Sequence, residues 1–148
     1  MNTRTPEALA RDILTRGLAV VGLLGIALIH LLDAIPTFSE LPYKGWLYVA
    51  LIVGSLAAAS LLVRRASRAV WAGAAALAAG AALAFVYSRT VGLPGAADDV
   101  GNWAEPLGVA ALFVEAAVLA VSSYALHLGS RVAAHAGHQR ERGRPQAA

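Results

Sequence analysis

Four long apolar stretches, separated by short polar segments, dominate the pattern of hydrophobic and polar positions along the chain. They cover residues 17–35, 45–63, 69–88 and 106–128. A helix needs roughly 20 residues to cross about 30 Å of hydrocarbon, and lipid offers no partner for the backbone of an open-chain alternative. The pattern therefore predicts an all-α integral membrane protein, built as a four-helix up-down bundle.

The polar segments divide the chain into three parts. Residues 1–16 form an N-terminal arm, residues 17–128 the four-helix transmembrane domain, and residues 129–148 a basic tail. Pro36 follows the first apolar stretch and is expected to end its helix. The tail is rich in arginine and poor in large apolar residues, so we expect it to be disordered.

Composition supports the membrane assignment and removes several classes of chemistry. Of the 148 residues, 58% are hydrophobic and 14% are charged, against roughly 25% charged in an ordinary soluble domain. A soluble chain of this size has too much surface for so few charges to cover. The chain has no cysteine, which excludes disulfides, thiolate metal sites and cysteine nucleophiles.

Basic residues are distributed unequally between the two ends of the predicted bundle. Ten of the twelve lie in the N-terminal arm, the 64–68 hairpin and the tail, and only Lys44 and Arg89 lie at the opposite end. By the positive-inside rule, both termini are cytoplasmic and the protein spans the inner (cytoplasmic) membrane. A basic rim beside anionic lipid accounts for the net charge of +3, so we expect the bilayer as a partner and no nucleic acid.

Aromatic and small residues predict which surfaces meet the membrane interface and which pack. Rings with one polar edge prefer the headgroup level. We expect such an interface girdle to hold Tyr43, Trp46, Tyr48, Tyr87 and Trp103 at one end and Trp71 and Tyr124 at the other.

Helices in lipid associate through close backbone approach, which small residues allow. The third apolar stretch has small residues at helical spacing, namely Gly73, Ala76, Gly80 and Ala84. This stripe predicts that the third helix is the central packing helix. Similar notches are expected at Gly22, Gly25 and Gly54.

Glu115 is the single acidic residue within the fourth apolar stretch. It lies about ten residues into that stretch, roughly 13–15 Å below the membrane surface. A carboxylate at that depth costs about 2.5 kcal/mol or more and should face the bundle interior. Two interpretations stay open: a proton or cation site, or a protonated acid that hydrogen-bonds another helix.

His30 and Asp33 stand three residues apart, on one face of the first helix near the same end. A carboxylate beside an imidazole orients the ring. His30 lies one to two turns above the level of Glu115, so we expect Glu115 to lie nearer to His30 than to His127. The alternative for His30 and Asp33 is solvation at the interface without a further role.

The 90–105 loop is long for so small a bundle, and loops of this size are often functional. Arg89 precedes it on an acidic face, which predicts a salt bridge with one of the nearby acids, Asp33, Asp98, Asp99 or Glu105. The carboxylates of Asp98 and Asp99 suit a hard cation, although their spacing does not fit an EF-hand. Asn102 with Glu105 predicts a capping box at the start of the fourth helix.

The remaining histidines do not form a recognisable cofactor site. His30 and His127 are expected on the order of 20 Å apart along the helix axes, which is too far for one haem iron. The chain has no phosphate-binding loop, zinc signature or Ser-His-Asp pattern. We therefore expect no metal, no cofactor and no enzymatic activity.

Several segments resemble small four-span membrane proteins of high-GC actinobacteria. The resemblance lies in residues 88–95 (SRTVGLPG), 98–103 (DDVGNW), 105–108 (EPLG) and 112–115 (LFVE), together with HLLD at residues 30–33 and Tyr43-x-Gly-Trp46. It covers most of the membrane region. The resemblance implies a multi-pass membrane fold and an actinobacterial source, and that family has no known activity.

The sequence predicts a non-enzymatic multi-pass membrane protein, an accessory or sensing component whose polar half meets a cation or a partner. The partner is expected to be a second copy of the chain or another membrane protein. The alternative is a small proton-coupled transporter that acts as an oligomer through Glu115. The candidate residues for the proton, cation or partner site are Glu115, His30, Asp33, Arg89, Asp98 and Asp99.

Overall fold

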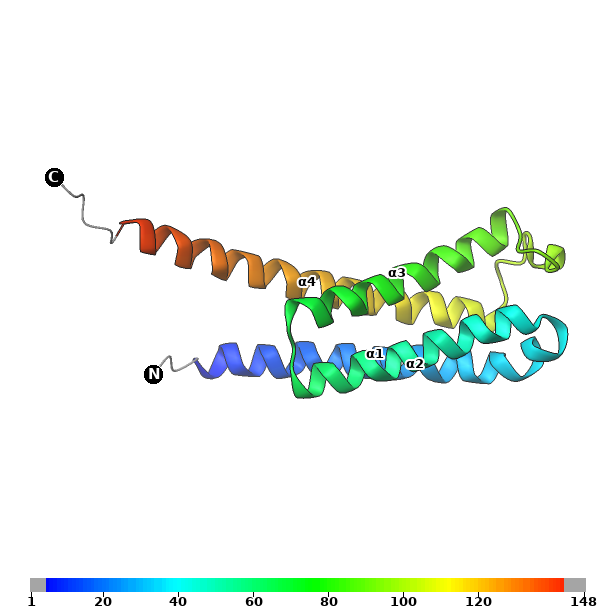
Figure 1. The fold of residues 1–148 in the computed structure, drawn as a ribbon, viewed down its shortest axis with the longest axis horizontal. Coiled ribbons are helices and arrows are strands. Elements are labelled where there is room, and N and C mark those ends of the chain that lie inside the picture. The colour runs from blue at the N-terminus through cyan, green and yellow to red at the C-terminus, as the bar shows by residue number, and fades with distance from the viewer. Residues whose placement is uncertain (1–4, 143–148) are drawn as a thin grey trace.

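Four long helices make up the computed structural model, which describes residues 5–142 and side chains as far as Gly129. They are α1 (Pro6–Glu40), α2 (Pro42–Arg64), α3 (Arg68–Thr90) and α4 (Pro106–Arg142), with a short 3-10 helix η1 (Ala97–Asp99) between α3 and α4. Successive helices run in opposite directions (Figure 1). All four are long and apolar enough to cross a membrane, so the predicted all-α four-helix bundle is confirmed.

The two ends of the bundle carry different segments. We call the end with the turn at Leu41 and the 91–105 loop the loop end. The terminal end carries the start of α1, the turn between α2 and α3, and the last turns of α4, which project beyond the other helices (Figure 1). A residue's level between these ends follows from its position in the helix, at about 1.5 Å per residue.

The first helix is longer than its apolar stretch at both ends. It begins at Pro6, where the Thr5 hydroxyl accepts a hydrogen bond from the Ala8 N–H at 3.3 Å. It also continues through Pro36, where the sequence predicted its end, and stops at Glu40. Proline removes one backbone hydrogen bond but does not forbid a further turn. The chain turns instead at Leu41, whose backbone is extended (φ −140°) because Pro42 follows and begins α2.

The fourth helix also exceeds its predicted span. The sequence predicted a disordered tail from residue 129, whereas α4 runs on to Arg142. The remainder of that predicted tail, residues 143–148, lies outside the described residues. The part of α4 that is apolar enough to span a membrane ends at Gly129.

Close packing joins α1 to both α2 and α4, and α3 to α4, whereas α2 and α3 approach each other less closely. The α1–α4 contact uses two predicted notches. A Cβ placed on Gly22 would collide with Val118, and one placed on Gly25 would lie 3.2 Å from Val114. A Cβ at Gly54 of α2 would lie 3.0 Å from Leu77 of α3. These three glycines allow close helix approach, as predicted.

The small-residue stripe of α3 does not have its predicted role. Among the described residues, nothing lies within 4 Å of a Cβ placed on Gly73 or Gly80, so in this part of the chain the face packs against no neighbouring helix. The buried side of α3 instead carries Trp71, Ala74 and Ala78. In a helix this rich in alanine, small residues occur on every face, and their spacing alone does not identify the face that packs.

The aromatic residues also divide differently from the prediction. Tyr43, Trp46, Tyr87, Trp103 and Tyr124 are exposed on the outside of the bundle, where an interface girdle requires them. Two predicted girdle members point inward instead. Trp71 is buried in the core at the terminal end, and Tyr48 lies against His30. A ring near a span end can face either lipid or protein, and the sequence carries no signal that separates the two.

Candidate functional site: a polar cavity in the loop-end half

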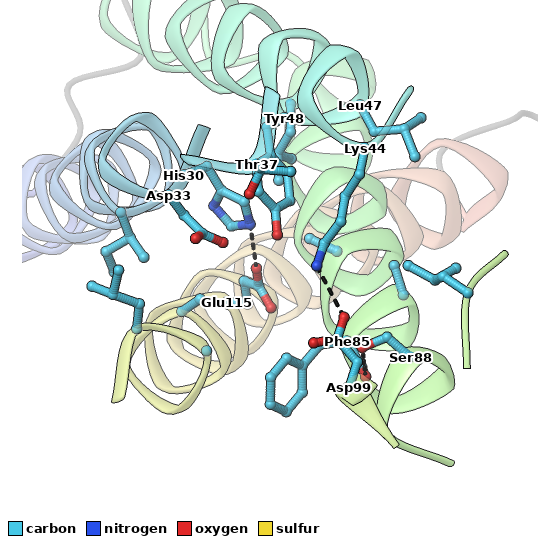
Figure 2. A pocket seen from close by; sticks show the side chains of 18 of the residues that line it. His30, Asp33, Thr37, Lys44, Leu47, Tyr48, Phe85, Ser88, Asp99 and Glu115 are labelled. Carbon is cyan, nitrogen blue, oxygen red and sulfur yellow. Dashed lines mark hydrogen bonds and ion pairs between the residues drawn. The ribbon is translucent and has the colours of Figure 1, made fainter. Parts of the chain in front are cut away.

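A cavity of about 660 Å³ occupies the loop-end half of the bundle, with lining residues from all four helices and the 91–105 loop. It extends into the gap where α2 and α3 diverge. Figure 2 shows His30 and Asp33 of α1, Tyr48 and Lys44 of α2, and Glu115 of α4 around it. The volume lies within the roughly 300–1,000 Å³ of small-molecule sites.

The innermost polar group is the pair formed by His30 and Glu115. The His30 Nε2 and Glu115 Oε1 atoms lie 3.8 Å apart, and the Glu115 side chain is 1% exposed. On its other side, His30 Nδ1 lies 2.9 Å from the carbonyl oxygen of Ile26. Because a carbonyl can only accept a hydrogen bond, Nδ1 carries a proton and donates it. In the neutral ring, Nε2 therefore presents a lone pair toward Glu115.

This tautomer determines what the pair can do chemically. A lone pair on Nε2 repels an ionised carboxylate but attracts either a protonated acid or a shared cation. The pair is electrically balanced when it holds one proton between the two side chains, on the oxygen or on the nitrogen. The arrangement can therefore bind one proton or exchange it for another cation.

The second carboxyl oxygen of Glu115 has no hydrogen-bond partner in the described part of the chain. Within the described part of the chain, Glu115 Oε2 is buried and makes no hydrogen bond, and the same holds for the hydroxyls of Ser55 and Ser122. Ser122 lies seven residues after Glu115, on the same face of α4 and about 10 Å nearer the terminal end. An unpaired buried oxygen costs about 1–3 kcal/mol, and the residue that carries this one, Glu115, lines the cavity.

Tyr48, rather than Asp33, packs against the His30 ring. The Tyr48 and His30 rings meet edge to face, with centroids 5.1 Å apart, and the Tyr48 hydroxyl interacts with the Asp33 carboxylate. The sequence predicted that Asp33 would orient His30 directly. Asp33 lines the cavity, but the described residues include no hydrogen bond or ion pair between Asp33 and His30. The Ile26 carbonyl and Tyr48 orient the imidazole instead.

A cluster of ion pairs closes the cavity at the loop end. Arg89 is 6% exposed, and its guanidinium contacts the Asp99 carboxylate at 2.5 Å and that of Glu105 at 3.7 Å. The Lys44 ammonium contacts the other oxygen of Asp99 at 3.0 Å. The guanidinium also lies 4.8 Å from the centre of the Phe85 ring. The predicted salt bridge of Arg89 is confirmed, and the ion-pair cluster ties α2 and α3 to the loop.

Asp99 is held in its ionised form by this cluster. Partial burial opposes ionisation, but the hydrogen bonds and positive charges of Lys44 and Arg89 outweigh it and keep the pKa of Asp99 below its ordinary value. Its neighbour Asp98 is exposed and does not line the cavity. The structure therefore brings Asp99 into the candidate site and leaves Asp98 outside it.

Glu105 has a second role, which differs from the predicted capping box. Its carboxylate accepts hydrogen bonds from the N–H groups of Leu107 at 2.9 Å and Gly108 at 2.5 Å. Glu105 thus caps α4 itself, because the helix begins at Pro106. Asn102 lies too far upstream to act as the cap. The carboxylate also lies at the positive end of the helix dipole.

Lys44, Tyr48 and Thr37 line the cavity but were not among the candidate residues. Two signals in the sequence point to them. Lys44 is the second cation at an acidic end, so the argument for pairing Arg89 applies to it equally. Thr37 follows His30 by seven residues, and Tyr48 follows Lys44 by four, so each shares a helical face with a polar partner.

Among the described residues, no group of three or more histidine, aspartate or glutamate side chains is arranged to hold a metal ion. The fold is a bundle of four helices, each long and apolar enough to span a membrane, with a cavity of polar and apolar residues at one end. No protein-family model, curated protein or solved structure matches the chain.

Proposed function

We propose that this protein is a non-enzymatic accessory or sensing component of the cytoplasmic membrane that binds a cation in its loop-end cavity. The observation that carries the proposal is the buried Glu115 carboxyl group. It meets the lone-pair side of His30, and its second oxygen has no hydrogen-bond partner among the residues that the structure describes.

Charge pairing within the cavity supports a cationic ligand. The two basic side chains of the lining, Lys44 and Arg89, are both engaged with Asp99. Asp33 and Glu115 line the same cavity and form no ion pair with a lysine or arginine in the described part of the chain. The free charge that faces the cavity is therefore negative, and a bound proton or cation would balance it.

The proposal is tested by labelling in native membranes with a lipophilic carbodiimide, which reacts with protonated carboxyl groups that it can reach. We expect an adduct on the α4 peptide that contains Glu115, and we expect added cations that compete for the site to reduce it. Glu115→Gln should lose this adduct. Asp98→Asn removes a carboxylate from the same end outside the cavity and should keep it.

An unlabelled Glu115 in folded protein would contradict the proposal and leave Glu115 with a packing role. Labelling that no cation reduces would also contradict it. Melting curves of Glu115→Gln and the wild type in detergent provide the control. They show whether the variant that loses the adduct is still folded.

A small proton-coupled transporter, acting as an oligomer, is the second candidate function. The observation that favours it is the pairing of His30 with Glu115, which is electrically balanced when the two side chains hold one proton between them. Because the proton and a cation would occupy the same site, binding of the cation would release the proton. Reconstitution in vesicles with a pH gradient separates the two functions. A transporter should dissipate the gradient when substrate is added, and Glu115→Gln should abolish this, whereas an accessory or sensing protein should leave the gradient intact.

The family resemblance and the placement of both termini in the cytoplasm stay predictions of the sequence. Neither affects the cavity, but the orientation decides which side of the membrane the loop end faces. With the loop end outside, the ligand would come from the outer side or from the bilayer.

A further inference from the structure

The cavity has two unlike walls. His30, Asp33 and Glu115 supply polar and acidic groups from α1 and α4. The apolar wall lies on α2 and α3 beyond their polar loop-end residues, and its members include Leu47, Leu51, Ala76, Leu77, Gly80, Ala81 and Ala84. A small inorganic cation would use the first wall and leave the second without contact. The ligand that satisfies both walls has a positive charge at one end and a hydrocarbon body at the other.

The cavity is open at the level of the membrane interior. Gly80 lines it and is exposed, and nothing lies within 4 Å of a Cβ placed there. Leu47, on the facing helix, lines the cavity while 59% exposed. Gly80 lies about 18 Å along α3 from the start of that helix, well inside an apolar span. An amphipathic molecule dissolved in the bilayer can therefore reach the cavity sideways, between α2 and α3.

An acyl chain of a lipid is a poorer match than a cation with a hydrocarbon body. A chain without charge would fill the apolar wall but leave the carboxyl groups of Glu115 and Asp33 facing hydrocarbon, which is costly. An anion is excluded by the same two groups, because Lys44 and Arg89 are already neutralised by Asp99 and Glu105.

We propose that the cavity binds an amphipathic organic cation, a protonated amine with a hydrophobic body, taken up from the bilayer between α2 and α3. Its ammonium group lies against Glu115, and its hydrocarbon lies along the exposed small residues of α3. This inference rests on the proposed cation site at Glu115 and adds the chemical class of the cation. The cavity volume of about 660 Å³ accommodates a molecule of that kind.

Binding of 4-phenylbutylamine to the full chain in non-ionic detergent tests the proposal, with 4-phenylbutanol as the uncharged analogue of nearly the same shape. We expect saturable calorimetric binding of the amine and at least tenfold weaker binding of the alcohol. Glu115→Gln should weaken amine binding at least tenfold. Asp98→Asn, which removes an exposed carboxylate at the same end, should leave it unchanged.

Two glycine variants test the cavity independently of the charge. Gly73 and Gly80 both lie on α3 with open space around a placed Cβ, but only Gly80 belongs to the cavity lining that the structure describes. Gly80→Leu should extend a side chain into the cavity and weaken amine binding at least tenfold. Gly73→Leu should leave it unchanged.

Equal binding of the amine and the alcohol would overturn the proposal in favour of an uncharged lipid-like occupant. Unaltered binding in either Glu115→Gln or Gly80→Leu would place the amine elsewhere and also overturn it. The two proposals fail separately. If Glu115 is labelled and cations reduce the labelling but no amine binds, the organic-cation inference is wrong while the cation site stands. If Glu115 is not labelled, the cation site itself is wrong.

Discussion

The terminal-end and loop-end halves of the bundle use the same four helices in different ways. Toward the terminal end, Leu23, Leu62 and Trp71 fill the space between helices and belong to one apolar core. Toward the loop end, α2 and α3 diverge, and His30 and Glu115 border a cavity in place of a core. A helix bundle in lipid needs one well-packed region to hold its geometry, and the other region is then free to enclose polar groups and a ligand.

The contrast also explains why the loop end needs ion pairs. Apolar contacts do not drive helices together in lipid, because the lipid chains are equally apolar. Where the packing loosens, Arg89, Lys44 and Asp99 tie α2, α3 and the loop together. The terminal-end half relies on close backbone approach, as at Gly22 of α1 against Val118 of α4.

The largest expected difference between the two ends is their side of the membrane. The excess of arginine at the terminal end predicts that this end is cytoplasmic. A reporter that is active only outside the cytoplasm should give full signal when fused after Ala97 and none when fused after Ser67. A cytoplasmic reporter at the same two positions should give the reverse. Signals opposite to these would place the cavity toward the cytoplasm.

Substitution of Gly22 should have the largest effect on stability. A leucine there would force α1 and α4 apart, because even a Cβ at Gly22 collides with Val118. Overpacking of this kind costs about 1–3 kcal/mol and occasionally more, and we expect the upper end of that range for Gly22→Leu. The midpoint of thermal unfolding in detergent measures it. Gly73→Leu provides the control, since it places the same side chain in open space.

Removal of Asp99 should destabilise the loop end by a smaller amount. Asp99→Asn leaves Arg89, 6% exposed, with a single distant carboxylate. Loss of one partner from a buried pair costs about 3–5 kcal/mol. Because the Asp99 side chain is 21% exposed, solvent screening reduces this to about 2 kcal/mol. Unfolding in detergent at neutral pH measures the difference, with Asp98→Asn as the control, which should melt like the wild type.

The same variant has a characteristic pH dependence. The ion pairs keep the pKa of folded Asp99 below its ordinary value of 3.8. A depressed pKa stabilises the fold above the unfolded-state value, and the stabilisation is lost as the pH falls through the folded value. The difference in unfolding free energy between the wild type and Asp99→Asn should therefore be constant above about pH 5. It should disappear as the pH falls below 3.8. A stability difference that persists in strong acid would mean that Asp99 stabilises the fold through its shape rather than its charge.

The sequence predicts the features that follow from length and charge, and it fails where one helix face must be chosen. The four spans, the inward position of Glu115 beside His30, and the pairing of Arg89 all follow from the cost of polar groups in lipid. That cost does not predict where the helices end, that Tyr48 points inward, or that one face of α3 is open. An apolar span in lipid has apolar residues on every side, so the period that identifies the core face of a soluble helix is weak here.

The smallest expected effect is that of Gly80→Leu on stability, and it distinguishes an open cavity from a packed groove. If α3 packed through its small residues, a leucine at Gly80 would separate two helices and lower the melting temperature. In the structure a Cβ at Gly80 meets nothing within 4 Å, so no helix has to move. Leucine also favours the helix by roughly 0.5–1 kcal/mol relative to glycine, so the variant should melt at the wild-type temperature or slightly above it. A fall comparable to that of Gly22→Leu would show that another segment or a second copy of the chain occupies the gap between α2 and α3, and the cavity would then not be open to the bilayer.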